Sequence, residues 1–430
     1  MSRTFFKQGL AIAVTTVMMG SVHAATEKEE IQQLRQEIEA LKALVNQQQQ
    51  VQQSQQVRLA EVASQPAVTA AKAKTKAGAE VTVYGFVRGD ANYIIEGADD
   101  DFNSVAKVGG TGSSDPKLTQ DKLRATAKTT RLGLDFKTDI EGANVGGKVE
   151  VDFAGSNEAL RIRHAYLTLN NWLFGQTTSN FLSNHAPEMI DFGTNVGGGT
   201  ARIPQVRYAH KLAPQTQLFI SAEEGNSSAN EWKLNDKNVE VLESSSVTYR
   251  LPTLTAKLTQ GFAEGKGQAS ARALIEHYKS ESANDDEFAY GVAAGANFQV
   301  SDPLKVSADV TYVKGNSNYL YGSNSAYVLD DNNDIAQNEA VGVQVGGTYK
   351  ISPKLRTTLA YGAVFADDGT EYASLNTSGN EKVQQAWANL IYTPVKPVDL
   401  GVEYVNGKRE TFAGQSFKDN RVGLMAKYHF

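Results

Sequence analysis

The sequence predicts an all-β transmembrane barrel of about 16 antiparallel strands, preceded by an N-terminal α-helical coiled coil. Three observations predict this fold class. From residue 80 onward, apolar and polar residues alternate with the period of a half-buried strand. Short and long connections between these strands alternate along the chain. After residue 24 no stretch is apolar enough to span a bilayer as a helix, so the chain could cross a membrane only as a closed barrel.

Composition excludes several classes of protein. The chain has 430 residues and a formal net charge of -6, whereas a duplex nucleic-acid partner calls for many Lys and Arg that neutralise phosphates. It contains no Cys, which excludes disulfides, thiolate metal sites and Cys nucleophiles. Its 37 Gly against 10 Pro, with 17 Tyr and 17 Phe, favour strands and turns over helices.

The first 24 residues indicate a secretory signal peptide. Arg3 and Lys7 precede an apolar run from Gly9 to Val22, and small residues surround a cleavage point after Ala24. A membrane anchor fits less well, because the run is shorter than the roughly 20 residues that a spanning helix needs and acidic residues follow it.

Residues 25–62 carry a heptad repeat, which predicts a coiled coil. Its apolar a and d positions are expected to mediate self-association: Ile31, Leu34, Ile38, Leu41 and Val45. Glutamates at g and basic residues at the following e positions favour parallel helices, but Gln-filled layers leave the number of helices open. The other interpretation is a polar disordered tether, which "QQQQVQQSQQ" would also fit.

Residues 63–79 indicate a flexible linker, since they contain Pro66, small residues and three lysines. Contact with the cell wall or with lipid headgroups is a secondary role that the coiled coil and the linker lysines could serve. We expect the barrel to occupy residues 80–430.

Period two is clearest in three segments. "VTVYGFVRGD" places Val81, Val83 and Val87 on one face and polar residues on the other, and "RLGLDFKTD" and "GKVEVDF" repeat this pattern. We expect sixteen strands, near residues 80–95, 123–139, 145–153, 161–170, 172–178, 203–211, 215–223, 239–250, 254–263, 286–299, 303–314, 338–351, 354–366, 381–393, 397–408 and 419–430. Residues 269–280 could form a strand or a loop helix, which leaves eighteen strands open.

The connections between these strands alternate in length. Tight turns, such as "NN" at 170–171 and "SP" at 352–353, alternate with long polar loops, such as 179–202 and 315–337. Only the loop near 154–160 is short on the long-loop side. Segregation by parity is typical of an outer-membrane barrel, whose periplasmic turns are short and whose outer loops are long.

The chain ends in a two-faced strand, "RVGLMAKYHF". Leu424 and Tyr428 belong to an apolar row that we expect to face lipid, whereas Arg421, Lys427 and His429 face inward. We expect this strand to close on the one that begins near Glu80, with Phe430 at the periplasmic interface.

The signal peptide, Gln-rich coiled coil, Lys/Ala linker and terminal Phe430, with "TTRLGLDFKTDIEG" and "RIRHAYLTLNNWLFGQTTSNF", resemble the DcaP-like outer-membrane porins of Gram-negative bacteria. The resemblance covers essentially the whole chain. It implies a homotrimer of sixteen-stranded barrels in the outer membrane, surrounded by lipid and lipopolysaccharide, with a periplasmic coiled coil. It also implies a preference for small anionic solutes, notably dicarboxylates, including aromatic ones.

An anion channel needs fixed positive charge at its narrowest point, and Arg suits carboxylates because its planar fork binds both oxygens. Strand parity predicts these inward-facing residues: Arg88, Arg131, Lys148, His164, Tyr166, Arg207, Arg250 and Lys257. Arg161 and Arg163 have the lipid-facing parity and would need a rim position or a bulge. Each cation could instead be an ordinary solvated charge, or an ion-pair partner of Asp135, Glu150 or Asp152.

The loop at 179–202 is predicted to narrow the lumen, because it is long and carries apolar residues such as Phe181 and Ile190. His185, Glu188, Asp191 and Phe192 would then lie close to a permeating solute, and Gly197 to Gly199 would let the chain return to the wall. The other interpretation is contact with a neighbouring subunit.

Enzyme motifs are missing from the sequence, and we expect neither a cofactor nor a metal site. There is no G-x-S-x-G or H-E-x-x-H, and "DDNNDIAQNE" has Ile335 where a calcium loop needs Gly. The favoured function is passive diffusion of small anions through an Arg-lined constriction. Other readings are a general diffusion porin without anion preference, a barrel for envelope tethering or adhesion, and a secreted soluble β-rich enzyme.

Overall fold

The structure is a computed structural model that describes residues 73–76, 78–109, 120–234, 240–280, 282–283 and 285–430. The predicted signal peptide, the coiled coil with its heptad residues from Ile31 to Val45, and most of the linker lie outside the described residues. Residues 71–430 belong to one compact unit.

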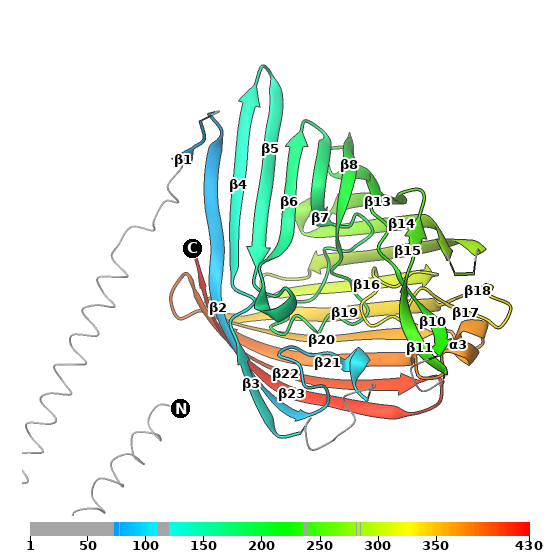
Figure 1. The fold of residues 1–430 in the computed structure, drawn as a ribbon. Coiled ribbons are helices and arrows are strands. Elements are labelled where there is room, and N and C mark those ends of the chain that lie inside the picture. Colours follow the sequence, from blue (N-terminus) through cyan, green and yellow to red (C-terminus); the bar gives the residue numbers. More distant parts are fainter. Residues whose placement is uncertain (1–72, 77, 110–119, 235–239, 281, 284) are drawn as a thin grey trace, which may run out of the picture. The chain divides into compact units, whose positions relative to one another are not determined.

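Sixteen antiparallel strands close into a barrel within the part of the chain that the structure describes (Figure 1). Round the wall they are β2 (Glu80–Glu96), β4 (Arg131–Ile140) with the short β3 (Lys122–Thr126) before it, β5 (Ala143–Asp152), β6 (Arg161–Leu169), β7 (Trp172–Thr178), β8 (Arg202–Ala213), β9 (Thr216–Glu223), β13 (Thr253–Phe262) with β12 (Thr248–Tyr249) before it, β14 (Gly267–Ser280), β15 (Asp285–Gln299), β16 (Leu304–Lys314), β19 (Glu339–Ser352), β20 (Leu355–Ala366), β21 (Asn380–Tyr392), β22 (Val398–Thr411) and β23 (Ser416–His429). The two-residue β1 (Ala73–Lys74) pairs with β2.

The predicted strand count is confirmed, but one predicted wall strand is replaced by a segment that the sequence had left open. The segment 239–250 was expected in the wall; instead β11 (Glu240–Ser246) pairs with β10 (Ser228–Leu234) in a separate sheet. Residues 267–280, left open as strand or helix, form β14, which pairs with β13 and β15 along its length. Alternation of side chains occurs in loop hairpins as well as in wall strands, so it could not separate the two cases.

The two ends of the barrel differ in the length of their connections. One end carries tight turns, at 141–142, 170–171, 214–215, 263–266, 300–303, 353–354 and 393–397. The other carries the long connections 97–121, 179–201, 224–252, 315–338 and 367–379, together with short ones at 153–160, 281–284 and 412–415. We call these the short-turn end and the long-loop end. The turn at 263–266 contains the short helix η3 (Ala263–Gly265), where Glu264 has a φ of 55°.

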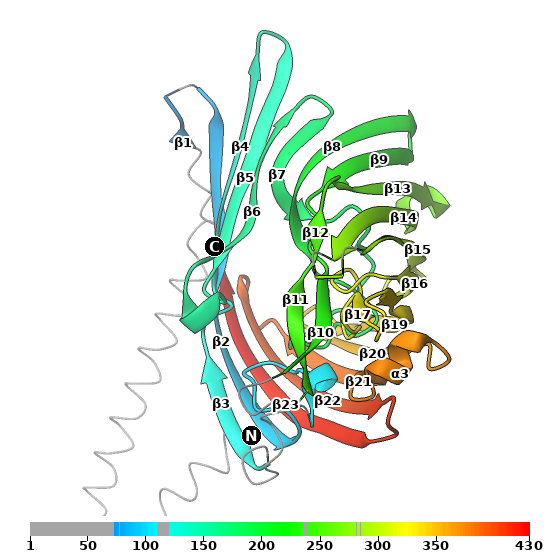
Figure 2. The ribbon, with the colours of Figure 1, turned by 45° about the vertical axis from the view of Figure 1, so that its right-hand side comes forward.

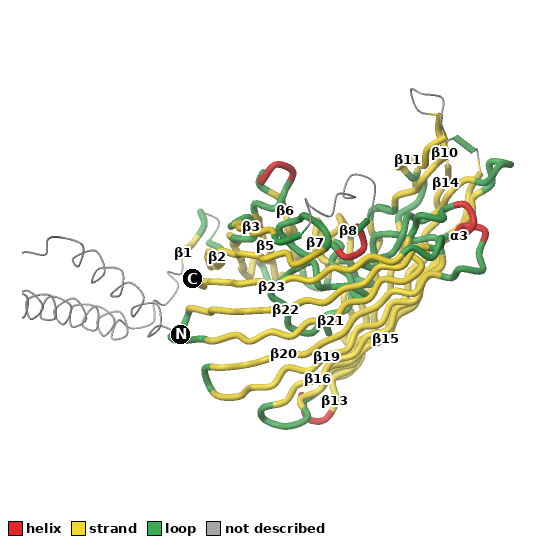
Figure 3. Tube along the Cα trace, turned by 90° about the horizontal axis from the view of Figure 1, so that it is seen from below, coloured by secondary structure: helices red, strands yellow, loops and turns green. Residues whose placement is uncertain are grey.

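A smaller sheet stands at the long-loop end, away from the C-terminus (Figures 2 and 3). Its strand order is β11, β10, β17 (Tyr327–Leu329) and β18 (Ile335–Gln337), and the helix α3 (Glu371–Leu375) contacts the last two. Ala229 and Tyr327 of this sheet pack with Tyr278 of β14. Two further short helices, η1 (Val105–Lys107) and η2 (Ser156–Glu158), lie in long-loop-end connections.

Large apolar side chains cover the outer face of the barrel. Alternate residues of the wall strands are exposed, for example Val83 and Val87 on β2, Leu132 and Leu134 on β4, and Val402 on β22. The intervening residues face the lumen and are mostly polar, as in a membrane barrel. No helix in the described ranges is long and apolar enough to cross a membrane.

The last strand closes the barrel on β2, as predicted. Phe430 donates its backbone N–H to the Gly85 carbonyl at 3.1 Å, and the Gly85 N–H donates to the Phe430 carbonyl at 3.2 Å. A Cβ at Gly85 would lie 2.9 Å from the Phe430 ring and 2.2 Å from the Arg131 carbonyl oxygen. The terminal ring therefore occupies the space that a side chain at residue 85 would need.

Candidate functional site

The connection between β7 and β8, residues 179–201, folds against the inner wall of its own barrel. Phe181, Leu182 and Val196 are buried in a cluster with lumen-facing residues of β8, β14, β15, β16, β19, β20 and β21. We call residues 179–201 the constriction loop. Its contacts run from β9 through β22 to β2, so the loop lies against the larger part of the wall.

Buried carboxyl groups of the wall hold this loop at its start and at its middle. Near its start, Glu223 of β9 accepts hydrogen bonds from the Ser179 hydroxyl at 2.6 Å and from the Asn180 N–H at 2.7 Å. Further along, Glu403 of β22 accepts from the backbone N–H groups of Ile190 at 2.8 Å and Asp191 at 2.7 Å. These donors are neutral, so the two carboxyl groups act as acceptors for otherwise unpaired loop groups.

Two predicted loop residues bind the wall between those anchors. The His185 ring nitrogens lie 2.9 Å from the Ser270 hydroxyl and 2.9 Å from the Asn297 amide, and the side chain is 2% exposed. The Glu188 carboxylate forms a two-pronged ion pair with Arg356 of β20, with its closest N···O distance at 2.9 Å. Both side chains therefore hold the loop in place.

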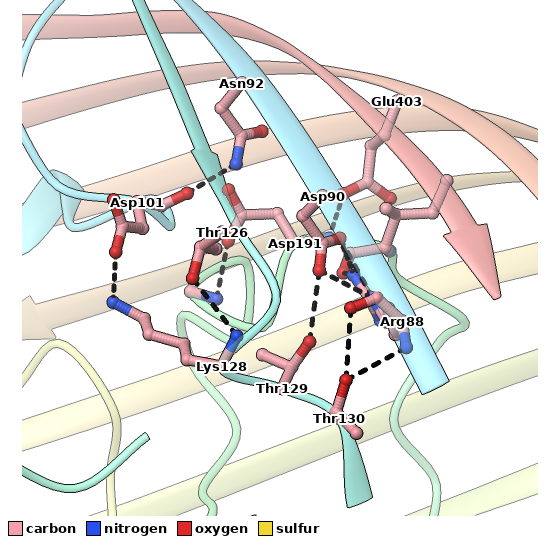
Figure 4. A network of polar contacts seen from close by, with 12 residues as sticks. Arg88, Asp90, Asn92, Asp101, Thr126, Lys128, Thr129, Thr130, Asp191 and Glu403 are labelled. Atoms are coloured by element: carbon pink, nitrogen blue, oxygen red, sulfur yellow. Dashed lines mark hydrogen bonds and ion pairs between the residues drawn. The ribbon is translucent and has the colours of Figure 1, made fainter. Parts of the chain in front are cut away.

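A network centred on Arg88 joins the constriction loop to the first strands (Figure 4). Arg88 pairs with Asp90, with an Nη2–Oδ1 distance of 2.6 Å, and donates to the Ile190 carbonyl at 2.5 Å. Thr129, in the break between β3 and β4, donates to Asp90 at 3.1 Å. Asp191 accepts the Asn103 N–H at 2.7 Å and so links the loop to residues 97–109.

The remaining part of the wall, β4 to β8, carries a group of arginines. Arg163 pairs with Glu150 at 2.8 Å and with Asp152 at 2.9 Å, and Arg161 forms two hydrogen bonds with Asp152. Arg131 lies 3.3 Å from Glu150 and 5.0 Å from the Phe86 ring centroid. Arg202, at the start of β8, is close enough to the other three arginines to be repelled by their charges. We call Arg131, Arg161, Arg163 and Arg202 the arginine cluster.

The arginine cluster holds more positive than negative charge, because four guanidinium groups surround two carboxylates. Arg202 donates to the Thr200 carbonyl at 3.3 Å, and no described carboxylate lies within ion-pair distance of it. Arg161 keeps 47% of its side chain exposed. The cluster can therefore attract an anion without first breaking all of its ion pairs.

A bulge explains how Arg163 reaches the lumen. The register between β5 and β6 shifts at Glu150, which pairs with His164, and Val151, which pairs with Ile162. Arg163 is the extra residue, so Arg163 and His164 both face inward while Ile162 is exposed outside. His164 donates to or accepts from the Thr177 hydroxyl at 2.9 Å.

A second cationic position lies nearer the short-turn end. Arg207 stacks 5.7 Å from the Phe219 ring centroid and has no carboxylate partner among the described residues. With Lys211 and Trp172 it lines a cavity of about 240 Å³. Lys257 lies on β13, which pairs with β9, and donates to the Leu182 carbonyl at 2.8 Å.

The remaining predicted residues are placed as follows. Lys148 pairs with Asp135 at 3.3 Å and lies 4.6 Å from the Tyr84 ring centroid. Tyr166, half-buried, contacts the His164 ring edge-on at 6.5 Å between centroids. Phe192 is exposed, and its ring centroid lies 4.6 Å from the Arg88 guanidinium carbon.

Four predictions need correction. Arg88, His185 and Asp191 were expected to meet the solute, but each is less than 4% exposed beneath or within the constriction loop. The position of a residue in an alternating strand predicts which side of the sheet its side chain faces, but it does not predict whether a loop covers that side chain. Arg250 was expected in the lumen; it lies between β12 and β13 at the long-loop end and lines a cavity with His277 and Asp286. Its assignment failed because 239–250 is not a wall strand.

Several functional residues were missed from the sequence. Glu223, Glu403 and Arg356 hold the loop, and Arg202 completes the arginine cluster. For the two glutamates a signal did exist, since each is an inward-parity acidic residue without a basic neighbour in sequence. No group of three or more His, Asp or Glu residues that could hold a metal ion occurs within the described ranges.

Comparison with known proteins decides the family. The family described as DcaP outer membrane protein matches residues 10–430. The crystal structure of the outer membrane channel DcaP of Acinetobacter baumannii is 66% identical, with a TM-score of 0.77, and the match covers 84% of this chain and 100% of that chain. The chain belongs to the DcaP outer membrane protein family.

Membership of this family makes the protein an outer-membrane porin, and family identity implies a non-enzyme. More distant structures share the fold. An anion-selective porin from Comamonas acidovorans is 12% identical, with a TM-score of 0.52 and coverage of 82% of this chain and 100% of that chain. Salmonella typhi OmpF in complex with daunomycin is 14% identical, with a TM-score of 0.52 and coverage of 82% and 98%. No curated protein matches the chain.

Proposed function

We propose that this porin passes small anionic solutes by passive diffusion, with a preference for dicarboxylates, including aromatic ones. One observation carries the proposal: in the arginine cluster, four guanidinium groups surround only two carboxylates. The constriction loop opposite adds little negative field, because Glu188 is paired with Arg356 and Asp191 is buried.

The geometry suits carboxylates in particular. A guanidinium group presents a planar fork that binds both oxygens of a carboxylate. Its attraction is strengthened in a narrow lumen, where the effective dielectric constant is lower than in bulk water. The arginine cluster and Arg207 are two separate cationic positions, as a solute with two carboxylates would use. Phe86 and Phe219 lie beside Arg131 and Arg207, which favours an aromatic body between the charged ends.

Reversal potentials in planar bilayers test the proposal. The double variant Arg202→Gln/Arg207→Gln removes two cations that have no carboxylate partner, so no acidic group is left unpaired. We expect the native channel to prefer chloride over potassium, and the double variant to lose about threefold of that preference, since each of the two lumen charges contributes less than about 1 kcal/mol in a solvated pore.

Arg250→Gln is the matched control, because it makes the same change at an exposed arginine outside the lumen. Added succinate or benzenedicarboxylate should reduce chloride current through the native channel more than acetate or benzoate does. Cation preference in the native channel would refute anion selection and leave a general diffusion porin. Equal effects of mono- and dicarboxylates would refute the dicarboxylate preference alone.

We also propose that residues 1–24 are removed as a signal peptide and that 25–62 form a periplasmic coiled coil, tethered by 63–79, which helps to assemble a homotrimer. The heptad positions Ile31 to Val45 support this proposal. Native mass spectrometry of the mature protein and of a variant that lacks 25–62 tests it. A monomeric native protein would refute the trimer, and an intact trimer after the deletion would refute the role of the coiled coil.

A further inference from the structure

Three lysines gather on the outer face of β21, β22 and β23, close to the long-loop end. Lys408 of β22 and Lys418 of β23 are direct cross-strand partners. Lys382 of β21 lies opposite Glu410 of β22. Like charges directly opposite each other on one face of a sheet destabilise it, so an anion bound between these lysines would stabilise the arrangement.

Local carboxylates do not balance this charge. Glu410 forms an ion pair with Lys408 and also faces Lys382, whose ammonium group lies 5.6 Å from the Phe365 ring centroid. Lys418 is exposed and has no carboxylate partner among the described residues. On the β2 side, Glu96 accepts a hydrogen bond from the Asn420 amide. Of the three lysines, only Lys408 forms an ion pair with a carboxylate among the described residues.

The lysines stand at the edge of the apolar outer face. On β22 the outward residues run from Leu400 and Val402 through Tyr404 to Asn406 and then Lys408. Tyr404 and Asn406 both donate to the Asn420 side-chain oxygen, at 3.1 Å and 2.6 Å. The order from apolar to hydrogen-bonding to cationic follows the order of acyl chains, interface and headgroups in a bilayer.

We propose that Lys382, Lys408 and Lys418 form a docking surface for a phosphorylated glycolipid of the surrounding leaflet. A phosphate group would sit between Lys408 and Lys418 and relieve their repulsion. The acyl chains would lie along the apolar residues of β22 and β23. A free anion would gain only the first of these contacts, so the combination of lysines and apolar face favours a lipid.

Native mass spectrometry of the detergent-purified full chain, with defined lipids added, tests this proposal. The probe is bis-phosphorylated lipid A, compared with dephosphorylated lipid A. We expect Lys408→Gln/Lys418→Gln to weaken binding of the phosphorylated lipid about tenfold, because each lysine near an anionic headgroup contributes to affinity. Binding of the dephosphorylated lipid should be weak in the native protein and unchanged in the variant.

Lys350→Gln/Lys396→Gln is the matched control, since it removes the same charge from exposed lysines at the short-turn end. It should bind lipid A as the native protein does. The single variant Lys418→Gln, at a side chain without a partner, covers the case in which the double variant fails to fold. Heat-modifiable migration reports folding.

Three outcomes would overturn the proposal: native affinity in both lysine variants, equal binding of the two lipids, or displacement of the lipid by millimolar inorganic phosphate. The last would indicate a simple anion site. Conductance and ion selectivity should be unchanged in every variant, so this proposal and the anion-channel proposal can fail separately.

Discussion

Two parts of the lumen wall use charged residues in opposite ways. From β9 to β22, acidic groups such as Glu223 and Glu403 are fully buried and accept hydrogen bonds from neutral loop groups. From β4 to β8, arginines outnumber their carboxylate partners and part of their surface stays open to the lumen. Acids hold the constriction loop on one side, and bases face the passage on the other.

This difference shows how a net acidic chain can gather a surplus of basic groups on one part of its lumen wall. A carboxyl group that is buried and bound by backbone N–H groups is out of reach of a solute, whereas a guanidinium group that shares one carboxylate with other arginines can still bind an anion. The overall charge of the sequence therefore says little about the charge that a solute meets.

Glu403→Ala should have the largest effect. It would leave the N–H groups of Ile190 and Asp191 without their acceptor, whereas the Asn389 amide would keep the Glu188 carbonyl. We expect the free energy of unfolding to fall by about 2–4 kcal/mol, because buried donors without partners are costly, and single-channel conductance to rise as the loop loosens. Denaturant unfolding and planar-bilayer recordings measure both. Glu410→Ala, on the outer face of the same strand, should change neither conductance nor loop order; an equal effect would contradict the anchoring role.

Arg163→Gln should affect both stability and selectivity, which separates it from Arg202→Gln. Arg163 neutralises Glu150 and Asp152, so its loss leaves two acidic groups with fewer partners. We expect a fall of about 1–3 kcal/mol in unfolding free energy together with reduced anion preference. Arg202→Gln should reduce anion preference with little change in stability. If both variants destabilise the barrel equally, the distinction between paired and unpaired arginines is wrong.

Glu276→Gln tests whether every buried carboxyl group controls the passage. Glu276 accepts from the Ser227 and Thr253 hydroxyls and the Asn316 amide, which belong to the long-loop end and not to the constriction loop. The amide keeps one acceptor oxygen, so we expect a loss of about 1 kcal/mol in unfolding free energy. Conductance and reversal potential should stay at native values, and a change in either would place this group among the constriction anchors.

Acidification should have the smallest effect. Burial opposes ionisation of Asp101, but its ion pairs with Lys128 and Arg124 outweigh burial and lower the pKa of Asp101, and Lys122 and Arg124 lower that of Asp99 in the same way. A depressed folded-state pKa contributes stability that is present above the unfolded pKa, near 4, and is lost below it. Protection factors, which correct exchange rates for their intrinsic pH dependence, should therefore be unchanged for residues 120–128, which carry Lys122, Arg124 and Lys128, from pH 7 to pH 5 and should fall only below about pH 4. A loss of protection already at pH 5 would contradict these ion pairs.

Sequence reasoning found the barrel, the closing strand and the loop that folds inward, because these depend on period-two alternation and on where long loops occur. It failed for Arg250, since the paired strands β10 and β11 of a loop hairpin direct their side chains to alternate faces just as wall strands do. It also placed Arg88, His185 and Asp191 at the solute, since parity does not reveal that a loop covers a lumen-facing residue.

Alternation along each strand was enough to predict which residues face lipid and which face the lumen along most strands, because each side chain's face follows from its position in the strand. Which lumen residues a solute can reach could not be predicted in this way. That depends on the path of the constriction loop, on the bulge that turns Arg163 inward, and on which carboxyl groups are already occupied by hydrogen bonds. All three are set by contacts between residues that are distant in the chain.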